Sequence, residues 1–103
     1  MSKYHAKPTV ADGIRFSSIY ESARYKELKL LLRAGAITDL HMQPKFDLHV
    51  NGIKVCTYVG DFLYLDELGN TVLEDAKGVR TPVYRLKKKM MAAEYPWLPI
   101  TEV

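Results

Sequence analysis

The distribution of apolar and polar positions predicts a helix over residues 18–34. Apolar side chains recur there at the spacing of a helical turn, and Tyr25, Leu28 and Leu32 fall on one stripe. Gly35 follows directly and suits the left-handed conformation in which many helices end. We therefore expect this helix to pack on a core along the stripe of tyrosine and leucine.

A second helix is predicted over residues 82–94. Thr81 has the side chain of an N-cap, and Pro82 suits the first helical position, where a backbone N–H group would have no partner. The apolar stripe of this helix is expected to consist of Val83, Leu86, Met90 and Ala93. The basic residues that fall off this stripe are Arg85, Lys88 and Lys89.

Alternation of apolar and polar residues predicts strands between and after the helices. The expected strands are residues 36–42, 45–50, 53–65, 71–77 and 98–103, with a short one near residues 8–10. Asn51-Gly52 is a strong hairpin signal between the second and third of the longer strands. Both faces of residues 58–65 are apolar or aromatic, which predicts a central strand covered on both sides.

Two acidic residues interrupt these apolar strands. Alternation places Asp61 on a face with Leu63, and it places Asp75 and Lys77 together on one face of the next strand. The segment 66–70 supplies the turn that joins the two strands. Antiparallel pairing across this turn sets Asp61 opposite Asp75 or within one step of it, at a Cβ separation of about 4.5–5.5 Å.

Like charges that face each other destabilise a sheet unless a positive group lies between them. A divalent metal is the most economical such group, because Mg²⁺ is commonly held by one or two carboxylates together with water and phosphate oxygens. Lys77, beside the acidic pair, would position an attacking water or offset charge on a phosphorane-like transition state.

Glu21 lies on the inward stripe of the first predicted helix, four residues before Tyr25. With Ser18 it forms the pattern of a capping box, in which the glutamate reaches back to the amide of the N-cap residue. A glutamate in the first turn of a helix can also face a metal site. The sequence leaves both roles open.

Length and composition are those of a single domain over residues 1–103, with residues 1–11 as a loosely held arm. The hydrophobic content of 48% is enough for one core, and the formal net charge of +3 favours a polyanionic partner. One cysteine excludes an intramolecular disulfide and fits a reducing compartment. No apolar run has the length of a membrane span, so we expect a cytoplasmic protein without a membrane partner.

The order of these features resembles the PD-(D/E)xK nuclease superfamily. The ordered set is a helix with Glu21, a strand with Asp61, a strand ending in Asp75-Ala76-Lys77, and a basic helix. The runs DGIRFSSIYESARYKELKLLLRAGAITDLHMQPKF, YVGDF and EDAKG, with the RLKKK helix, resemble a family of small, mostly phage-borne, resolvase-like endonucleases of that superfamily. The resemblance covers nearly the whole chain. It implies an α/β (α+β) fold with a restriction-endonuclease-like core, in which a central mixed β-sheet is flanked by two helices.

The resemblance also implies roles for individual residues. Asp61 and Asp75 would ligate the metal, and Lys77 would be the motif lysine. Glu21 would be the acid of the first helix, close enough to serve a metal as well. Together these four residues form the expected catalytic set.

Two positions near the motif depart from a clean match, and a third is a further candidate for the site. Gly60 stands where the superfamily motif has proline, a substitution that the superfamily often shows. Glu74 is next to Asp75 and offers a second acid, although the spacing to Lys77 favours Asp75. Gln43 is a candidate for lining the site, but a strand-end glutamine more often satisfies backbone groups.

The activity that the resemblance implies is that of a Mg²⁺-dependent endodeoxyribonuclease, with Mn²⁺ as a substitute metal and no organic cofactor. The side chains expected to hold DNA phosphates are Arg80, Arg85, Lys87, Lys88 and Lys89. Because nothing looks like a base-reading helix, we expect selectivity for branched or junction DNA, and a homodimer would allow paired cuts. The expected setting is the cytoplasm of a phage-infected or prophage-carrying bacterium.

Two other functions compete with hydrolysis. A catalytically silent nuclease-like module would bind DNA or a protein without cutting. A structural phage protein would use its acidic residues only for helix capping and salt bridges. All the carboxylates that a silent module would have lost are present in the sequence, which favours the nuclease.

Overall fold

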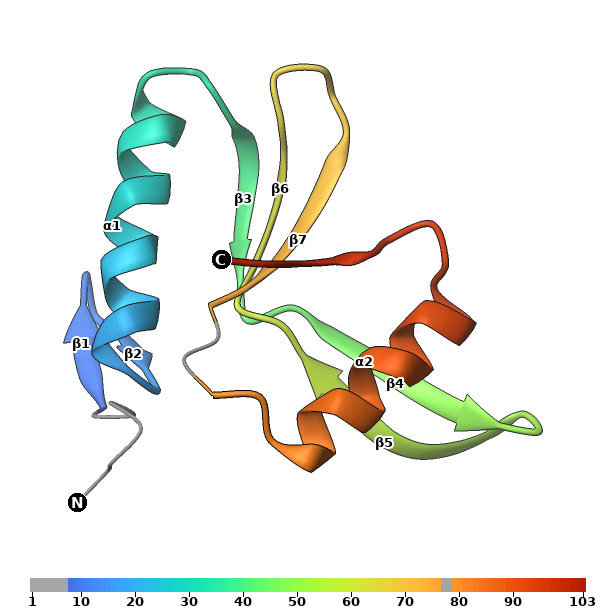
Figure 1. Cartoon of the computed structure of the whole chain (residues 1–103). Helices are drawn as coiled ribbons and strands as arrows, with labels where there is room; N and C mark the ends of the chain where they lie inside the picture. The colour runs from blue at the N-terminus through green and yellow to red at the C-terminus, as the bar shows by residue number, and fades with distance from the viewer. Residues whose placement is uncertain (1–7, 77–78) are drawn as a thin grey trace.

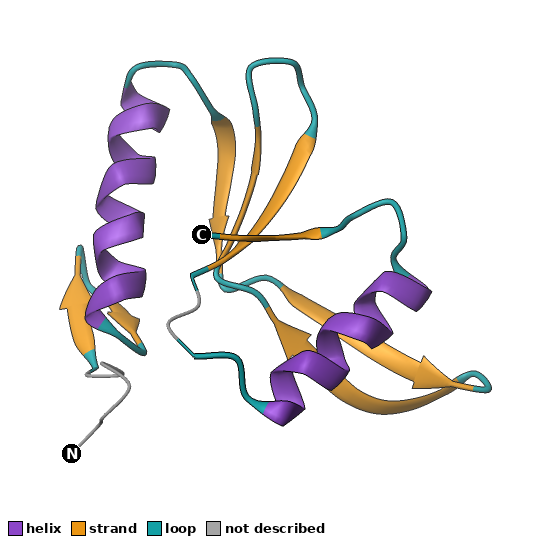
Figure 2. Ribbon diagram, viewed as in Figure 1, coloured by secondary structure: helices purple, strands orange, loops and turns teal. Residues whose placement is uncertain are grey.

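The structure, a computed structural model, describes residues 8–76 and 79–103, and within them it has two helices and eight strands (Figure 1). In chain order these are β1 (Thr9–Ala11), β2 (Ile14–Phe16), α1 (Ile19–Arg33), β3 (Thr38–Met42), β4 (Lys45–Val50), β5 (Ile53–Val59), β6 (Phe62–Leu65), β7 (Thr71–Asp75), α2 (Pro82–Glu94) and β8 (Ile100–Glu102). The fold is mixed α/β. Helix α1 lies on one side of the central strands, and α2 lies across the β4–β5 hairpin (Figure 2).

The central sheet is mixed and has the strand order β3-β6-β7-β8. β6 runs antiparallel to β3 and β7, whereas β8, the red strand that ends at the C label in Figure 1, runs parallel to β7. The last pair of the β6–β7 ladder joins Phe62 to Glu74, so the same register carries Asp61 toward Asp75. On the other edge of β7, Glu102 is the partner of Asp75. The expectation of a mixed sheet with two helices is confirmed.

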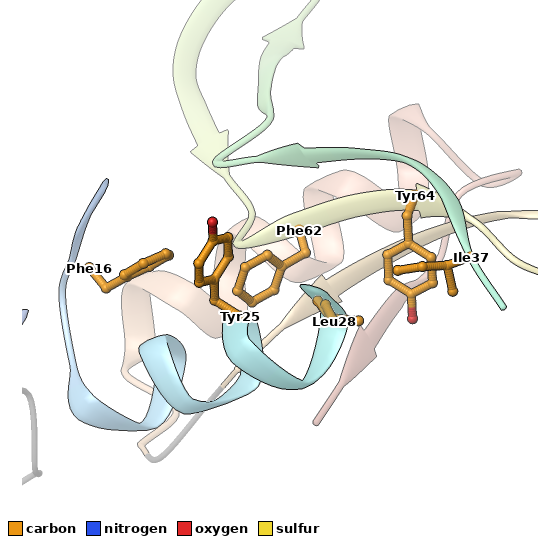
Figure 3. Packing of buried hydrophobic residues seen from close by; sticks show 6 residues of the cluster. All are labelled: Phe16, Tyr25, Leu28, Ile37, Phe62 and Tyr64. Carbon is orange, nitrogen blue, oxygen red and sulfur yellow. The ribbon is translucent and has the colours of Figure 1, made fainter. Parts of the chain in front are cut away.

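Two buried clusters surround this sheet. The cluster between α1 and the sheet consists of Phe16, Tyr25, Leu28, Ile37, Phe62 and Tyr64 (Figure 3). The other cluster joins α2, the β4–β5 hairpin and the sheet, and it consists of Leu48, Tyr58, Leu73, Tyr84, Met91 and Leu98. The stripe predicted for the first helix is confirmed, because its tyrosine and first leucine are buried.

The helix cap and the turns predicted from local sequence signals are confirmed. Ser18 caps α1 by accepting a hydrogen bond from the N–H of Glu21, and Gly35 after the helix has a φ of +78°. Asn51 and Gly52 have φ angles of +52° and +77°, which a two-residue turn of type I′ requires. These elements depend on a few neighbouring residues, so the sequence pattern was sufficient to predict them.

The prediction of one continuous strand over residues 53–65 is wrong. β5 and β6 are separated at Gly60-Asp61 and belong to different sheets. A Cβ atom on Gly60 would lie 2.7 Å from the Cδ1 atom of Leu73, so the backbone approaches the sheet more closely than a larger residue allows. Asp61 therefore lies at the junction of two sheets, where its N–H donates to the carbonyl of Glu74.

The predicted inward stripe of α2 is also wrong. Its members are mostly in contact with solvent: Val83 and Leu86 are 61% and 59% exposed, Ala93 is exposed and Met90 is half-buried. The helix instead buries Tyr84 and Met91. The hydroxyl of Tyr84 donates to Glu102 of β8, and this bond stabilises a helix orientation rotated by one residue, about 100°, from the predicted one.

Two expectations reach beyond the described residues. β7 ends at Asp75, and Lys77, the expected motif lysine, lies outside the described residues. Of the predicted arm over residues 1–11, residues 9–11 form β1 and pair with β2, while residues 1–7 are likewise not described. Neither described helix combines the length and the apolarity needed to cross a membrane.

Candidate functional site

Asp61 is held by backbone contacts from two directions. Its carbonyl accepts a hydrogen bond from the N–H of Gln43 at 2.8 Å, and its own N–H donates to β7 at 3.0 Å. The Oδ2 atom of its carboxyl group accepts from the N–H of Ala76 at 2.6 Å. The side chain is therefore directed to the end of β7, where the predicted partner Asp75 lies.

Three carboxyl groups from separate elements come together at this point, and we name them the acid cluster: Glu21 of α1, Asp61 of the β5–β6 junction and Asp75 of β7. Burial, followed by the negative charges of Asp75 and Glu21, raises the pKa of Asp61 from 3.8 to about 8. Glu21 and Asp75 are only 3% and 1% exposed. The fold therefore concentrates negative charge here to the point that Asp61 retains a proton at neutral pH.

Asp75 is oriented by a tyrosine that the sequence did not indicate. The hydroxyl of Tyr58 on β5 donates to Oδ2 of Asp75 at 2.5 Å, and both groups are buried. Burial and then this hydrogen bond raise the pKa of Tyr58, so it remains a donor at physiological pH. If residues 53–65 formed one continuous strand, alternation would place Tyr58 on the face opposite Asp61. The break at Gly60 removes that constraint and lets the hairpin direct Tyr58 at β7.

Glu74 does not join the acid cluster. It is 1% exposed and lies on the α1 side of the sheet, where Arg24 donates to its two oxygens at 2.8 and 2.7 Å. The hydroxyl of Tyr64 also donates to Glu74. The strand pleat thus separates two adjacent acids, and Asp75 is the one that lies with Asp61.

Glu21 has a mixed role. Its backbone N–H donates to the Oγ atom of Ser18 at 3.0 Å, as in the first half of a capping box. Its carboxylate accepts from the hydroxyl of Ser17 at 2.7 Å and also raises the pKa of Asp61. Glu21 therefore begins the helix through its backbone while its side chain belongs to the acid cluster.

Gln43 braces the backbone around the site. Its Nε2 atom donates to the carbonyl of Arg15 at 3.1 Å, and its N–H donates to the carbonyl of Asp61. The side chain is exposed and its φ is +55°. These contacts connect β2 with the β5–β6 junction, which is the backbone role that the sequence favoured for this glutamine.

The five predicted phosphate-binding residues divide into two groups. Four of them line an open pocket of about 390 Å³ beside α2, which we name the basic pocket: Arg80, Arg85, Lys88 and Lys89, together with Tyr84 and Glu102. Lys87 points to the hairpin instead, where its Nζ atom donates to the carbonyl of Thr57 at 2.9 Å. The basic pocket, rather than the whole helix, is therefore the positively charged feature next to the sheet.

The donor set of the acid cluster suits a hard cation, because it consists of carboxylate oxygens. Across residues 8–76 and 79–103, no group of three or more histidine, cysteine, aspartate or glutamate side chains already has the arrangement of a metal site. The raised pKa of Asp61 nevertheless reflects the negative charge of Asp75 and Glu21 around it, which a cation would offset. Asp61 and Asp75 therefore fit Mg²⁺ held by two carboxylates and water, and not a cage made only of protein ligands.

Comparison with curated proteins and with solved structures found no match. A family model described as a protein of unknown function, DUF1064, matches residues 1–103. Because this match spans all 103 residues, the chain belongs to the DUF1064 family.

Proposed function

We propose that this protein is a metal-dependent endonuclease that hydrolyses phosphodiester bonds in DNA, built on a restriction-endonuclease-like core. The observation that carries the proposal is the acid cluster, in which buried Glu21 and Asp75 and half-buried Asp61, from three separate elements, lie near enough for both charges to act on Asp61. Clusters of like charge are costly to fold, and strongly shifted pKa values gather at functional sites. The adjoining basic pocket supplies the charge that a phosphate backbone requires.

In this proposal Asp61 and Asp75 hold Mg²⁺, for which Mn²⁺ can substitute. When bound, the metal would polarise the scissile phosphate and lower the pKa of a coordinated water. Asp61 would give up its proton to water on becoming a ligand. The hydrogen bond from Tyr58 engages one oxygen of Asp75 and limits rotation of that carboxylate. Glu21 adds charge from the start of α1. Lys77, outside the described residues, remains the expected group that orients the water or the phosphate.

Substrate selectivity in this proposal comes from DNA shape. The cations of the basic pocket contact phosphates and read no bases, so branched or junction DNA is the preferred substrate. A homodimer would place two such sites for paired incisions. The proposed setting is DNA metabolism in the cytoplasm of a phage-infected or prophage-carrying bacterium, without a membrane partner or an organic cofactor.

One observation favours a second candidate, a nuclease-like module that binds DNA or a protein without cutting. Asp75 is 1% exposed and engaged by Tyr58, and the described acids do not form a ready three-ligand group. Such a module would keep the basic pocket and use the acids only to position neighbouring backbone.

A cleavage assay distinguishes the two candidates. Purified protein is incubated with branched and linear DNA, with and without Mg²⁺ or Mn²⁺, and compared with Asp75→Asn and with Glu67→Gln, an exposed acid in the β6–β7 turn that serves as a control for charge. We expect metal-dependent nicking that Asp75→Asn abolishes and Glu67→Gln retains, with DNA binding kept by both variants. Binding without nicking, insensitive to metal and to Asp75→Asn, would favour the silent module.

A further inference from the structure

Glu102 lies inside the basic pocket, surrounded by hydrogen-bond donors. Arg80 donates to its Oε1 atom through Nε at 2.8 Å and lies at 2.7 Å through its terminal nitrogen. Its Oε2 atom accepts from the hydroxyl of Tyr84 at 2.6 Å and lies 3.1 Å from Nζ of Lys88. This fork of a guanidinium, an ammonium and a hydroxyl around one anion is also the arrangement that recognises a phosphate group.

The pocket keeps a surplus of positive charge around this single carboxylate. Hydrogen bonds from Arg80 and then Tyr84 lower the pKa of Glu102 to about 2, so it is ionised at neutral pH. Four cations and one anion line the pocket, which leaves a formal charge of +3. Within the described part of the chain, Arg85 and Lys89 take part in no ion pair. The pocket therefore keeps two cations that Glu102 does not engage and that a second anion could contact.

The pocket adjoins the acid cluster. Glu102 is the β8 partner of Asp75, so their Cα atoms lie about 5 Å apart on neighbouring strands. The N–H of Val103 donates to the carbonyl of Asp75 at 3.1 Å. Burial comes first among the causes that raise the pKa of Tyr84, and the charges of both Glu102 and Asp75 contribute. An anion held in the pocket would thus lie beside the proposed site of hydrolysis.

We propose that the basic pocket is a subsite for a backbone phosphate of the nucleic acid, and that the Glu102 carboxylate occupies it as an intramolecular competitor. Rotation of the Glu102 side chain releases Arg80 and Lys88 to the incoming phosphate, while the β8 backbone stays paired with β7. The identity of the polyanion rests on the proposed function. The subsite itself does not depend on hydrolysis.

The test is DNA binding in EDTA, so that a failure of cleavage cannot be mistaken for a failure of the subsite. A short fluorescent DNA duplex is titrated at several salt concentrations with the unmodified protein, Glu102→Gln and Glu67→Gln. Glutamine keeps an oxygen that can accept from Tyr84, which preserves the packing of α2. Glu67→Gln changes the net charge equally at a distant exposed turn.

We expect Glu102→Gln to bind the DNA duplex roughly tenfold more tightly than the unmodified protein at low salt. This is the affinity that one added charge-assisted hydrogen bond contributes. The slope of log K against log salt should steepen by about 0.9 for each additional phosphate that the protein neutralises, and Glu67→Gln should leave it unchanged. Binding by Glu102→Gln that is equal to or weaker than that of Glu67→Gln overturns the proposal, because Glu102 would then only organise the pocket.

A second comparison tests the pocket as the phosphate subsite without changing Glu102. The double variant Arg85→Gln/Lys89→Gln removes two pocket cations that Glu102 does not engage, and Lys87→Gln removes a cation of the same helix that points to Thr57. We expect the double variant to flatten the salt slope and Lys87→Gln to leave it nearly unchanged. Equal effects per charge would place the phosphate-binding surface outside the pocket.

Discussion

Replacing Asp61 with asparagine should stabilise the folded protein at and above neutral pH in the absence of metal. The pKa of Asp61 is raised in the folded state, from 3.8 to about 8, so the folded protein keeps a proton that the unfolded chain has lost. The free energy of unfolding must then fall as pH rises through this window, from about pH 4 to about pH 8. Asparagine cannot ionise, and its side-chain oxygen can still accept from the N–H of Ala76.

The size of the effect follows from the same difference in pKa. At about 1.4 kcal/mol per pKa unit, ionising Asp61 in the folded protein costs at most about 6 kcal/mol. Asp61 is partly open to solvent, which screens its neighbours, so we expect roughly 2–4 kcal/mol. This is a large part of the stability of a small domain, about 5–15 kcal/mol, and is readily measured.

Urea unfolding in EDTA at about pH 5 and about pH 8 measures the change in the free energy of unfolding across most of this window. The unmodified protein should lose several kcal/mol more than Asp61→Asn between the two pH values, and Glu67→Gln should behave as the unmodified protein does. If the unmodified protein and Asp61→Asn lose equal stability, Asp61 does not carry the proton, and the reasoning from the acid cluster fails.

Three further predictions concern the contacts around the cluster. Millimolar Mg²⁺ near pH 8 should raise the melting temperature of the unmodified protein and not that of Asp61→Asn, and no rise in either would count against a metal site. Arg24→Met should cost about 3 kcal/mol of unfolding free energy because it leaves the Glu74 carboxylate buried without its cation. Adding Glu74→Gln, which removes the unpaired charge and keeps an oxygen for Tyr64, should recover most of this loss, and no recovery would contradict the pairing. Tyr58→Phe should lower the free energy of unfolding by about 1–3 kcal/mol, as measured with urea, because it removes the donor to Asp75. The control is Tyr20→Phe at an exposed tyrosine, and a loss in Tyr58→Phe no larger than in this control would show that the bond does not stabilise the fold.

Much of the fold followed from signals that act over a few residues. The limits of α1 depend on Ser18 and Gly35, and the β4–β5 hairpin depends on Asn51-Gly52. Such caps and turns are decided by the conformational preferences of adjacent residues, so they can be read without the rest of the chain. The approach of Asp61 to Asp75 was also predictable, because turn length and strand period together set the register.

Tertiary contacts decided the rest. The strand break at Gly60 depends on how closely Leu73 packs against it, and the rotation of α2 depends on a partner for Tyr84 in β8. Glu102 carried no local signal, because its role exists only where β8 brings it among the cations of α2. A short sequence window determines which backbone conformation is favourable. Which side chain is buried, paired or left to bind a ligand depends on residues that only the folded chain brings together.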